Sequence, residues 1–265
     1  MSSLTRELQR RRDVAVDIAR LAGRTTLDRF RSHDLHVEIK ADASPVTAAD
    51  RFAETLLRDR IAAAFPHDAI LGEEFGEQAG TSGFRWILDP IDGTKSFIRG
   101  VPLYGTLIGV EHDERSGVGV IYIPGSDECV HAVRGEPAWY QIGKSAPTAA
   151  RVSQTAELSK SLFCTSDPVT FLKVGRERQL HQLLSMSGQC RTWGDCYGYL
   201  LVATGRADVM VDPQMSIWDA AALQPIIESS GGTFTDFQGR PTIYSGDAIA
   251  TNGLIHDAVL RITAG

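Results

Sequence analysis

Apolar positions near the beginning of the chain recur with the spacing of an α-helix. They predict an amphipathic helix over residues 4–30, with its apolar stripe at Leu8, Val14, Ile18 and Leu21. Thr5 is the expected N-cap of this helix, and Gly23 is a weak point within it. Residues 35–40 then alternate between apolar and polar side chains, which predicts a strand.

A second helix is predicted over residues 48–65. Residues 41–45 before it form a turn-rich loop, and Thr47 is the expected N-cap. Pro66 and the two residues after it end the helix. Its predicted apolar face includes Phe52, Leu56, Leu57 and Ile61.

The pattern changes to that of strands between residues 86 and 133, where charged or glycine-bearing turns separate the apolar runs. This half is therefore predicted to lay helices on a largely antiparallel sheet. From residue 162 onward, helices and strands alternate. The predicted strands there are 162–165, 190–193, 208–211 and two near Thr233 and Ala248; the predicted helices are 169–187, 197–205 and 218–230. Pro225 lies inside the last of these helices and predicts a kink.

These patterns predict an α/β protein with an α+β N-terminal lobe over residues 1–150 and an α/β C-terminal lobe over residues 151–265. The chain has 265 residues, which is long for one domain and short for two independent ones. We therefore expect a single structural unit with its active site between the lobes. The N-terminal lobe would carry the metal-binding loops and the C-terminal lobe the residues that recognise the substrate.

Composition and charge exclude several classes of function. The net charge of −6 argues against a broad surface for nucleic acid, and Arg10 to Arg12 are predicted to lie on a solvated helix face. The longest apolar stretches, such as residues 103–110, are far shorter than the roughly 20 residues that span a bilayer. No signal-peptide pattern begins the chain, so we expect a cytoplasmic protein without membrane contact. The four cysteines lack CxxC spacing and are predicted to be free thiols.

Acidic residues follow two apolar runs in the first half. Asp89 ends the run that begins at Trp86, Pro90 is expected to end strand pairing, and Asp92 follows in an Asp-Gly-Thr turn. Upstream, Gly72 allows a turn before Glu73 and its acidic neighbour Glu74. Carboxylates that converge in this way repel one another unless a cation lies between them, which indicates a site for a hard cation.

Four motifs in this order resemble those of the inositol monophosphatase superfamily of metal-dependent, lithium-sensitive phosphatases. They are Pro45 to Asp50, Gly72 to Glu74, Asp89 to Thr94 and Trp218 to Ala221. The resemblance covers essentially the whole chain. It implies a layered αβαβα sandwich, a small phosphorylated metabolite as substrate and a homodimer.

The resemblance also implies a magnesium centre of two or three ions, with manganese as an alternative because both metals prefer oxygen ligands. Glu73 and Asp89 would hold one ion together with the carbonyl of Ile91. Asp89, Asp92 and Asp219 would hold a second ion. Asp50 lies where the family orients waters for a weaker third ion.

Such a centre would hydrolyse a phosphate monoester by direct attack of an activated water. The resemblance assigns Thr94 and Glu73 to hold and deprotonate that water, and the backbone N–H groups of Gly93 and Thr94 can point at the phosphate. Each residue also has a purely structural interpretation. Glu74 would be a surface acid, Asp92 a turn former, and Asp219 and Asp50 helix-capping residues.

The substrate follows from weaker signals. Asp195, the run from Arg99 to Pro102 and the closing run from Ala250 to Asp257 resemble the histidinol-phosphatase branch of the superfamily. Acids beyond the metal ligands would favour a substrate with an ammonium group and an imidazole. The candidate substrate-binding residues are Asp195, Asp212, Asn252 and Arg99.

Several alternatives stay open at this point. Asp195 would instead be a helix cap, and Asp212 and Asn252 would be turn residues. An inositol phosphatase or a sugar phosphatase of broad specificity is the closest alternative function. A non-catalytic interaction protein on the same fold is more distant, because a binding module has no need of carboxylates that repel one another.

Overall fold

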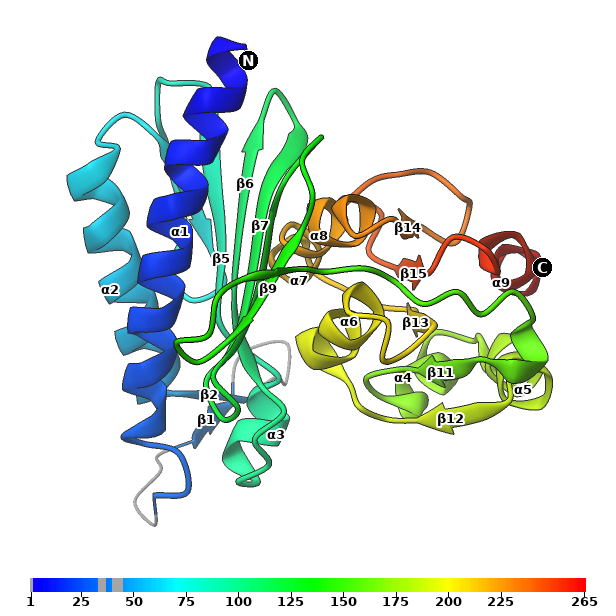
Figure 1. The fold of residues 1–265 in the computed structure, drawn as a ribbon. Helices are drawn as coiled ribbons and strands as arrows, with labels where there is room; N and C mark the ends of the chain where they lie inside the picture. Colours follow the sequence, from blue (N-terminus) through cyan, green and yellow to red (C-terminus); the bar gives the residue numbers. More distant parts are fainter. Residues whose placement is uncertain (1, 33–36, 40–44) are drawn as a thin grey trace.

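The chain forms five layers of helices and sheets in a computed structural model that describes residues 2–32, 37–39 and 45–265 (Figure 1). Helices α1 (Ser3–Leu27) and α2 (Ala48–Ala64) cover one face of an eight-stranded sheet. A middle layer separates this sheet from a five-stranded sheet, and it contains α6 (Asp195–Ala203), α7 (Ile217–Ala220) and α8 (Leu223–Ser229). The outer layer contains α4 (Pro168–Lys173), α5 (Glu177–Met186) and α9 (His256–Thr263). This arrangement confirms the predicted αβαβα sandwich.

The larger sheet has the strand order β10-β9-β8-β7-β6-β5-β3-β4 and is antiparallel except where β3 pairs with β5. Its strands are β3 (Ala69–Gly72), β4 (Gly76–Gln78), β5 (Phe84–Asp92), β6 (Gly105–His112), β7 (Arg115–Ile123), β8 (Glu128–Val133), β9 (Trp139–Ile142) and β10 (Thr148–Ala149). Short α3 (Thr94–Ile98) follows β5 directly. A separate pair of strands joins β1 (Val37–Ile39) to β2 (Pro45–Thr47).

The smaller sheet has the order β12-β11-β13-β15-β14. Its strands are β11 (Leu162–Cys164), β12 (Gln189–Arg191), β13 (Val209–Asp212), β14 (Thr233–Thr235) and β15 (Ala248–Thr251), and a 3₁₀ turn, η1 (Leu158–Lys160), precedes them. β11 is parallel to both of its neighbours, whereas β15 is antiparallel to β13 and β14. The change of sheet after β10 is compatible with a lobe boundary near residue 150, which stays a prediction.

Helix α1 differs from its prediction at its cap and on one face. Ser2 is the N-cap, because its hydroxyl accepts the Thr5 N–H at 3.0 Å, so the prediction that Thr5 caps the helix is wrong. Arg11 is not solvated either. Its guanidinium is buried and donates two hydrogen bonds of 2.8 and 2.9 Å to the Asp68 carboxylate. The carboxylate partner compensates the cost of burying the charge.

Helix α2 begins as predicted, with Thr47 as the N-cap. Leu57 and Ile61 lie in the core, but Phe52 is 59% exposed, so the predicted apolar face is wrong at that position. The strand predicted over residues 35–40 is present at Val37–Ile39. The rest of that strand and loop residues 41–44 lie outside the described residues.

Two predicted helices are each divided in the structure. The helix over residues 169–187 splits into α4 and α5, and Gly175 between them has a left-handed φ of 71°. The helix over residues 218–230 is interrupted after Ala220 and resumes at Leu223. Pro225 cannot donate to the Ala221 carbonyl four residues earlier. That carbonyl instead accepts a 2.6 Å hydrogen bond from Ser116 Oγ of β7.

Glycines in the larger sheet bring this interruption close to the strands. A Cβ added at Gly119 of β7 would lie 2.0 Å from the Ala222 carbonyl oxygen, and one at Gly109 of β6 would lie 2.6 Å from Ala221 Cβ. The close contact positions α7, whose residue Asp219 belongs to the site described below.

The predicted free cysteines are confirmed. Within the described ranges, no helix combines the length and apolarity that crossing a membrane requires.

Candidate active site

Asp89 and Asp92 both belong to β5, and an irregularity in this strand brings them to one side of it. Asp89 lies opposite Leu107 of β6. Asp92 lies opposite Gly105, so β5 advances by three residues over the span in which β6 advances by two. One extra residue in a strand reverses the alternation of the side chains beyond it. Pairing with β6 is interrupted after Asp89, as predicted for Pro90, but it resumes at Asp92, so the prediction is wrong in that Pro90 does not end the strand.

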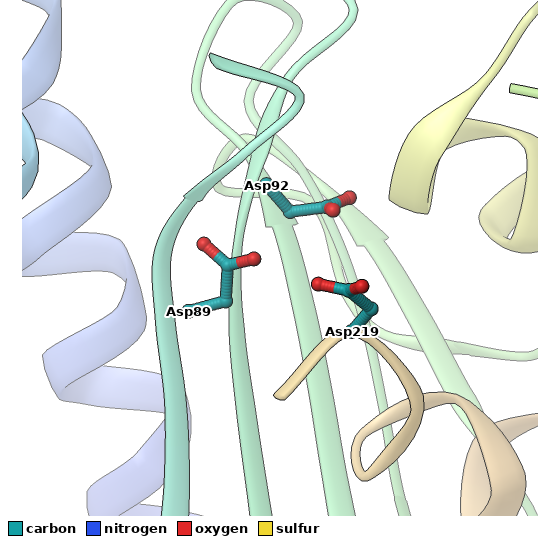
Figure 2. Close-up of side chains that lie close together, drawn as sticks. All are labelled: Asp89, Asp92 and Asp219. Atoms are coloured by element: carbon teal, nitrogen blue, oxygen red, sulfur yellow. The ribbon is translucent and has the colours of Figure 1, made fainter. Parts of the chain in front are cut away.

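Asp219 approaches the same space from the C-terminal half of the chain. Figure 2 shows its carboxylate on α7 pointing toward those of Asp89 and Asp92. One oxygen atom from each of the three side chains lies within 4.8 Å of the other two. Asp219 Oδ2 also accepts the N–H of Ser216, the N-cap of α7, at 2.7 Å, so Asp219 completes a capping box and also joins the cluster.

Burial and mutual repulsion make the ionised forms of these acids costly. Burial, followed by the charges of Glu73, Asp92 and Asp219, raises the pKa of Asp89 well above its usual range. Burial is also the main cause that raises the pKa of Asp219 to about 7. A cation between the three carboxylates would reverse this penalty.

Glu73 lies beside the cluster, in the turn that follows β3. Its backbone N–H donates to the Leu88 carbonyl at 3.2 Å, which fixes the turn against β5. Glu54 of α2 holds the other side of the turn, because its buried carboxylate accepts the backbone N–H groups of Glu74 at 2.7 Å and Phe75 at 3.2 Å. Gly72 allows this contact, since a Cβ there would lie 2.0 Å from Glu54 Oε1.

Asp50 has one oxygen in a helix cap and the other at the site. Oδ2 accepts the N–H of Thr47 at 2.8 Å and its hydroxyl at 2.5 Å. Oδ1 lies 3.5 Å from Thr94 Oγ1, which is also 3.1 Å from the Ile91 carbonyl oxygen. Burial raises the pKa of Asp50. The capping interpretation and the site interpretation thus describe different atoms of the same side chain.

Gly93, the N-cap of α3, is in contact with Asp195 at the beginning of α6. Gly93 has a left-handed φ of 89°, and a Cβ there would lie 2.9 Å from Asp195 Oδ2. Burial is the main cause that raises the pKa of Asp195 to about 6; Asp212 raises it further, and Lys95 lowers it. Lys95 itself forms a 3.3 Å ion pair with Asp167, the N-cap of α4. Asp195 is not an N-cap, since Gly194 occupies that position of α6.

The Asp212 carboxylate forms its hydrogen bonds with groups inside the protein. Its buried carboxylate accepts hydrogen bonds from Thr165 Oγ1 at 3.1 Å, Tyr199 Oη at 3.0 Å, and the N–H and hydroxyl of Ser166 at 2.8 and 3.0 Å. Burial raises its pKa and these donors lower it. Four internal donors favour a structural part for Asp212 over contact with a substrate.

The structure does not bring Asn252 to the carboxylate cluster. β15 runs antiparallel to β13, so Asp212 pairs with Ala248, at the end of β15 away from Asn252. Asn252 lies at the other end of β13, where its N–H donates to the Asp208 carbonyl at 3.1 Å. Its side-chain amide donates to the Ser153 hydroxyl at 2.9 Å and to the Thr155 carbonyl at 2.8 Å. Arg99 is exposed at the C-cap of α3.

Three residues that position the site were not predicted from the sequence. Glu54 holds the turn of Glu73, Ser166 contacts Asp212, and Cys196 donates its backbone N–H to the Asp92 carboxylate. The spacing of Glu54 and Arg58 signals only an ion pair within a helix. No local pattern marks the other two, because their contacts join segments that are far apart in the sequence.

Comparison with known proteins assigns the chain to a family of phosphatases. The family model described as the inositol monophosphatase family matches residues 7–264. The chain therefore belongs to the inositol monophosphatase family. The identification rests on nearly the whole chain, and it agrees with the carboxylate cluster and the layered fold.

Similar proteins include several named histidinol-phosphatase. One from Chlorobaculum parvum is 43% identical over 95% of this chain and 96% of that protein. One from Mycobacterium tuberculosis is 38% identical over 95% and 97%, respectively. Among solved structures, the extragenic suppressor protein suhB from Bartonella henselae has a TM-score of 0.87 at 30% identity, covering 95% of this chain and 97% of that one.

Proposed function

We propose that this chain is a magnesium-dependent phosphomonoesterase that hydrolyses histidinol phosphate to histidinol and phosphate. The observation that carries the proposal is the convergence of Asp89, Asp92 and Asp219, whose carboxylate oxygens lie within 4.8 Å of one another. Three ionised carboxylates in a partly buried space repel one another, and a cation between them would make their ionised forms favourable.

The residues present fit a magnesium centre. Magnesium prefers oxygen donors and retains several waters, so a few carboxylates are sufficient. Asp89, Asp92 and Asp219 supply such donors, and Glu73 is near enough for its charge to raise the pKa of Asp89 and Asp219. When bound, the ions would neutralise phosphate charge and lower the pKa of a coordinated water toward neutrality. Manganese would fit the same donors.

The remaining residues of the site have parts in positioning and proton transfer. The Thr94 hydroxyl, between Asp50 and the Ile91 carbonyl, would hold the attacking water by accepting one of its hydrogens. Glu73 would accept the proton that the water loses. The N–H groups of Gly93 and Thr94 would donate to the phosphate.

Substrate choice is attributed to Asp195. Its carboxylate lies over Gly93, beside the cluster, so a leaving group there would meet a negative charge. The ammonium group of histidinol phosphate would gain a charge-assisted hydrogen bond that a neutral polyol lacks. The relatives named histidinol-phosphatase, at 38–43% identity, support the same choice.

A phosphate-release assay tests the proposal. Histidinol phosphate, inositol 1-phosphate and a bisphosphorylated nucleotide would each be offered with magnesium and after its removal by a chelator. We expect rapid release from histidinol phosphate when magnesium is present and no release after magnesium is removed. Preference for inositol 1-phosphate would favour the function in the names of other relatives, such as the inositol-1-monophosphatase of Mesorhizobium japonicum, which is 30% identical. No release from any ester would overturn the proposal.

The resemblance to this family also supports a homodimer and a cytoplasmic location. The mass in solution, measured by light scattering, would be twice that of the 28.8 kDa chain for a dimer. Fractionation of cells that produce the protein tests the location.

A further inference from the structure

A row of hydrogen bonds connects the smaller sheet to the carboxylate cluster. Cys196, near the beginning of α6, donates its backbone N–H to the Asp92 carboxylate. The preceding N–H, that of Asp195, donates to Ser166 Oγ at 2.9 Å. Ser166 Oγ in turn donates to Asp212 Oδ2 at 3.0 Å. Two consecutive N–H groups of α6 thus have partners in different segments, one at the end of β5 and one in the loop after β11.

Asp212 is a fixed end point for this row. Its carboxylate is buried and also accepts the Ser166 N–H at 2.8 Å, Thr165 Oγ1 at 3.1 Å and Tyr199 Oη at 3.0 Å. The Ser166 hydroxyl has a single proton, and it points at Asp212. Its lone pairs are therefore directed toward the N–H of Asp195.

The conformation of Asp195 requires such support. Its φ is 53°, in the left-handed region that residues other than glycine rarely adopt. Such a conformation persists where surrounding contacts determine it. It also sets the direction of the next peptide N–H, that of Cys196. The contact that holds Asp195 in place thereby aims the hydrogen bond to Asp92.

We propose that Ser166 is a positioning residue for metal binding, because it fixes the peptide whose Cys196 N–H orients the Asp92 carboxylate. Partners that orient a metal ligand commonly change metal affinity by about 10- to 100-fold when they are removed. The inference rests on the proposed metal centre and adds to it a link between the two sheets, since Asp212 belongs to the smaller sheet and Asp92 to the larger one. Asp212 contributes to the same link, because its buried carboxylate holds the Ser166 hydroxyl in place.

The test is a calorimetric titration of the full chain with Mg²⁺ in the absence of substrate. We expect Ser166→Ala to weaken Mg²⁺ binding at the Asp92 site by about tenfold or more. Ser166→Cys keeps a weak donor and acceptor, so it should weaken binding less. The cysteine variant also provides the comparison if the alanine variant does not fold.

Thr165→Val is the matched control. It removes one hydroxyl donor to Asp212, as Ser166→Ala does, but the Thr165 hydroxyl does not contact the Asp195 N–H. We expect this control to keep the Mg²⁺ affinity of the wild type while losing thermal stability comparable to that lost in Ser166→Ala. Asp195→Gly should partly restore affinity in the Ser166→Ala background, since glycine adopts the left-handed conformation without strain.

The outcomes separate this inference from the proposed function. Equal Mg²⁺ affinity in the wild type and in both Ser166 variants would overturn the positioning role alone. An equal loss in Thr165→Val and Ser166→Ala would also overturn it, because general loosening around Asp212 would then explain the effect. A wild type that binds no Mg²⁺ would overturn the proposed metal centre itself.

Discussion

Asp89 and Asp92 present their carboxylates on the same side of β5 although they are three residues apart. In an unbroken strand, residues with this spacing face opposite sides. The extra residue between the pairs that they form with Leu107 and Gly105 removes the conflict. Local backbone geometry therefore creates the pair of acids, and Asp219 completes the cluster from another segment.

Thr94→Ala should lower kcat far more than it changes KM. The Thr94 hydroxyl is assigned to the attacking water, and its contacts are to Asp50 and Ile91. A group that acts mainly in the transition state affects kcat, whereas one that binds the substrate equally in both states affects KM. Steady-state kinetics with histidinol phosphate provide the measurement. Thr94→Ser keeps the hydroxyl and should keep most of the activity; a change in KM alone would show that Thr94 only binds the substrate.

Asp195→Asn should change the preference between substrates. Loss of one partner from a buried charge pair costs about 2–5 kcal/mol, so kcat/KM for histidinol phosphate should fall accordingly. Hydrolysis of inositol 1-phosphate should change little, because the carboxylate cluster is intact. The ratio of the two kcat/KM values is the measurement. An equal decrease for both esters would mean that Asp195 supports the structure and does not select the substrate.

The Arg11–Asp68 ion pair should make stability depend on pH in the acidic range. Burial raises the pKa of Asp68, but hydrogen bonds from Arg11, Ser82 and Trp86 outweigh it and leave the pKa below the usual 3.8. A lowered pKa in the folded state stabilises the fold above the unfolded-state pKa, and this contribution disappears as the pH falls through the folded-state pKa. Urea unfolding between pH 7 and pH 3 measures the effect.

Asp68→Asn should reduce stability at pH 7 by about 3–5 kcal/mol, because it leaves the Arg11 charge buried without its main partner. It should also flatten the loss of stability toward acid. Asp13→Asn is the control, since the ion pair of Asp13 with Arg12 has a carboxylate that is 69% exposed. We expect the control to change stability by less than about 1 kcal/mol. Equal effects of the two variants would contradict the importance of the buried pair.

Ser116→Ala should destabilise the junction between α7 and β7. The Ser116 hydroxyl replaces the hydrogen bond that Pro225 cannot give to the Ala221 carbonyl. An unsatisfied buried carbonyl costs about 1–3 kcal/mol, measurable by urea unfolding. Ser185→Ala removes a comparable hydroxyl-to-carbonyl bond at an exposed site and should cost much less. If both variants lose the same stability, water satisfies the Ala221 carbonyl.

Local patterns in the sequence predicted much of the fold and the acids of the site. Thr47 begins α2 as expected, and the apolar runs after Trp86 mark the central strands. The acids were recognisable because each lies in a short motif next to an apolar run. Their order along the chain gave the family.

Other features depend on how distant segments pair, which no local pattern contains. Arg11 is buried because Asp68 lies opposite it, although its helical position resembles a solvated one. Asn252 is separated from the cluster by the antiparallel register of β13 and β15. Asp212 gains internal donors from the residue that follows β11 and from α6. The bulge at Pro90 likewise became visible only through the pairing of β5 with β6.

Phosphate release by Asp92→Asn at saturating magnesium tests the metal centre most directly. Asparagine keeps the shape of the side chain but removes its charge, so we expect activity on histidinol phosphate to fall by about 100-fold or more while the thermal unfolding transition is retained. Asp113→Asn is the matched control, because the Asp113 side chain is 81% exposed, and it should keep full activity. Near-normal turnover in Asp92→Asn would contradict a magnesium centre built on Asp89, Asp92 and Asp219.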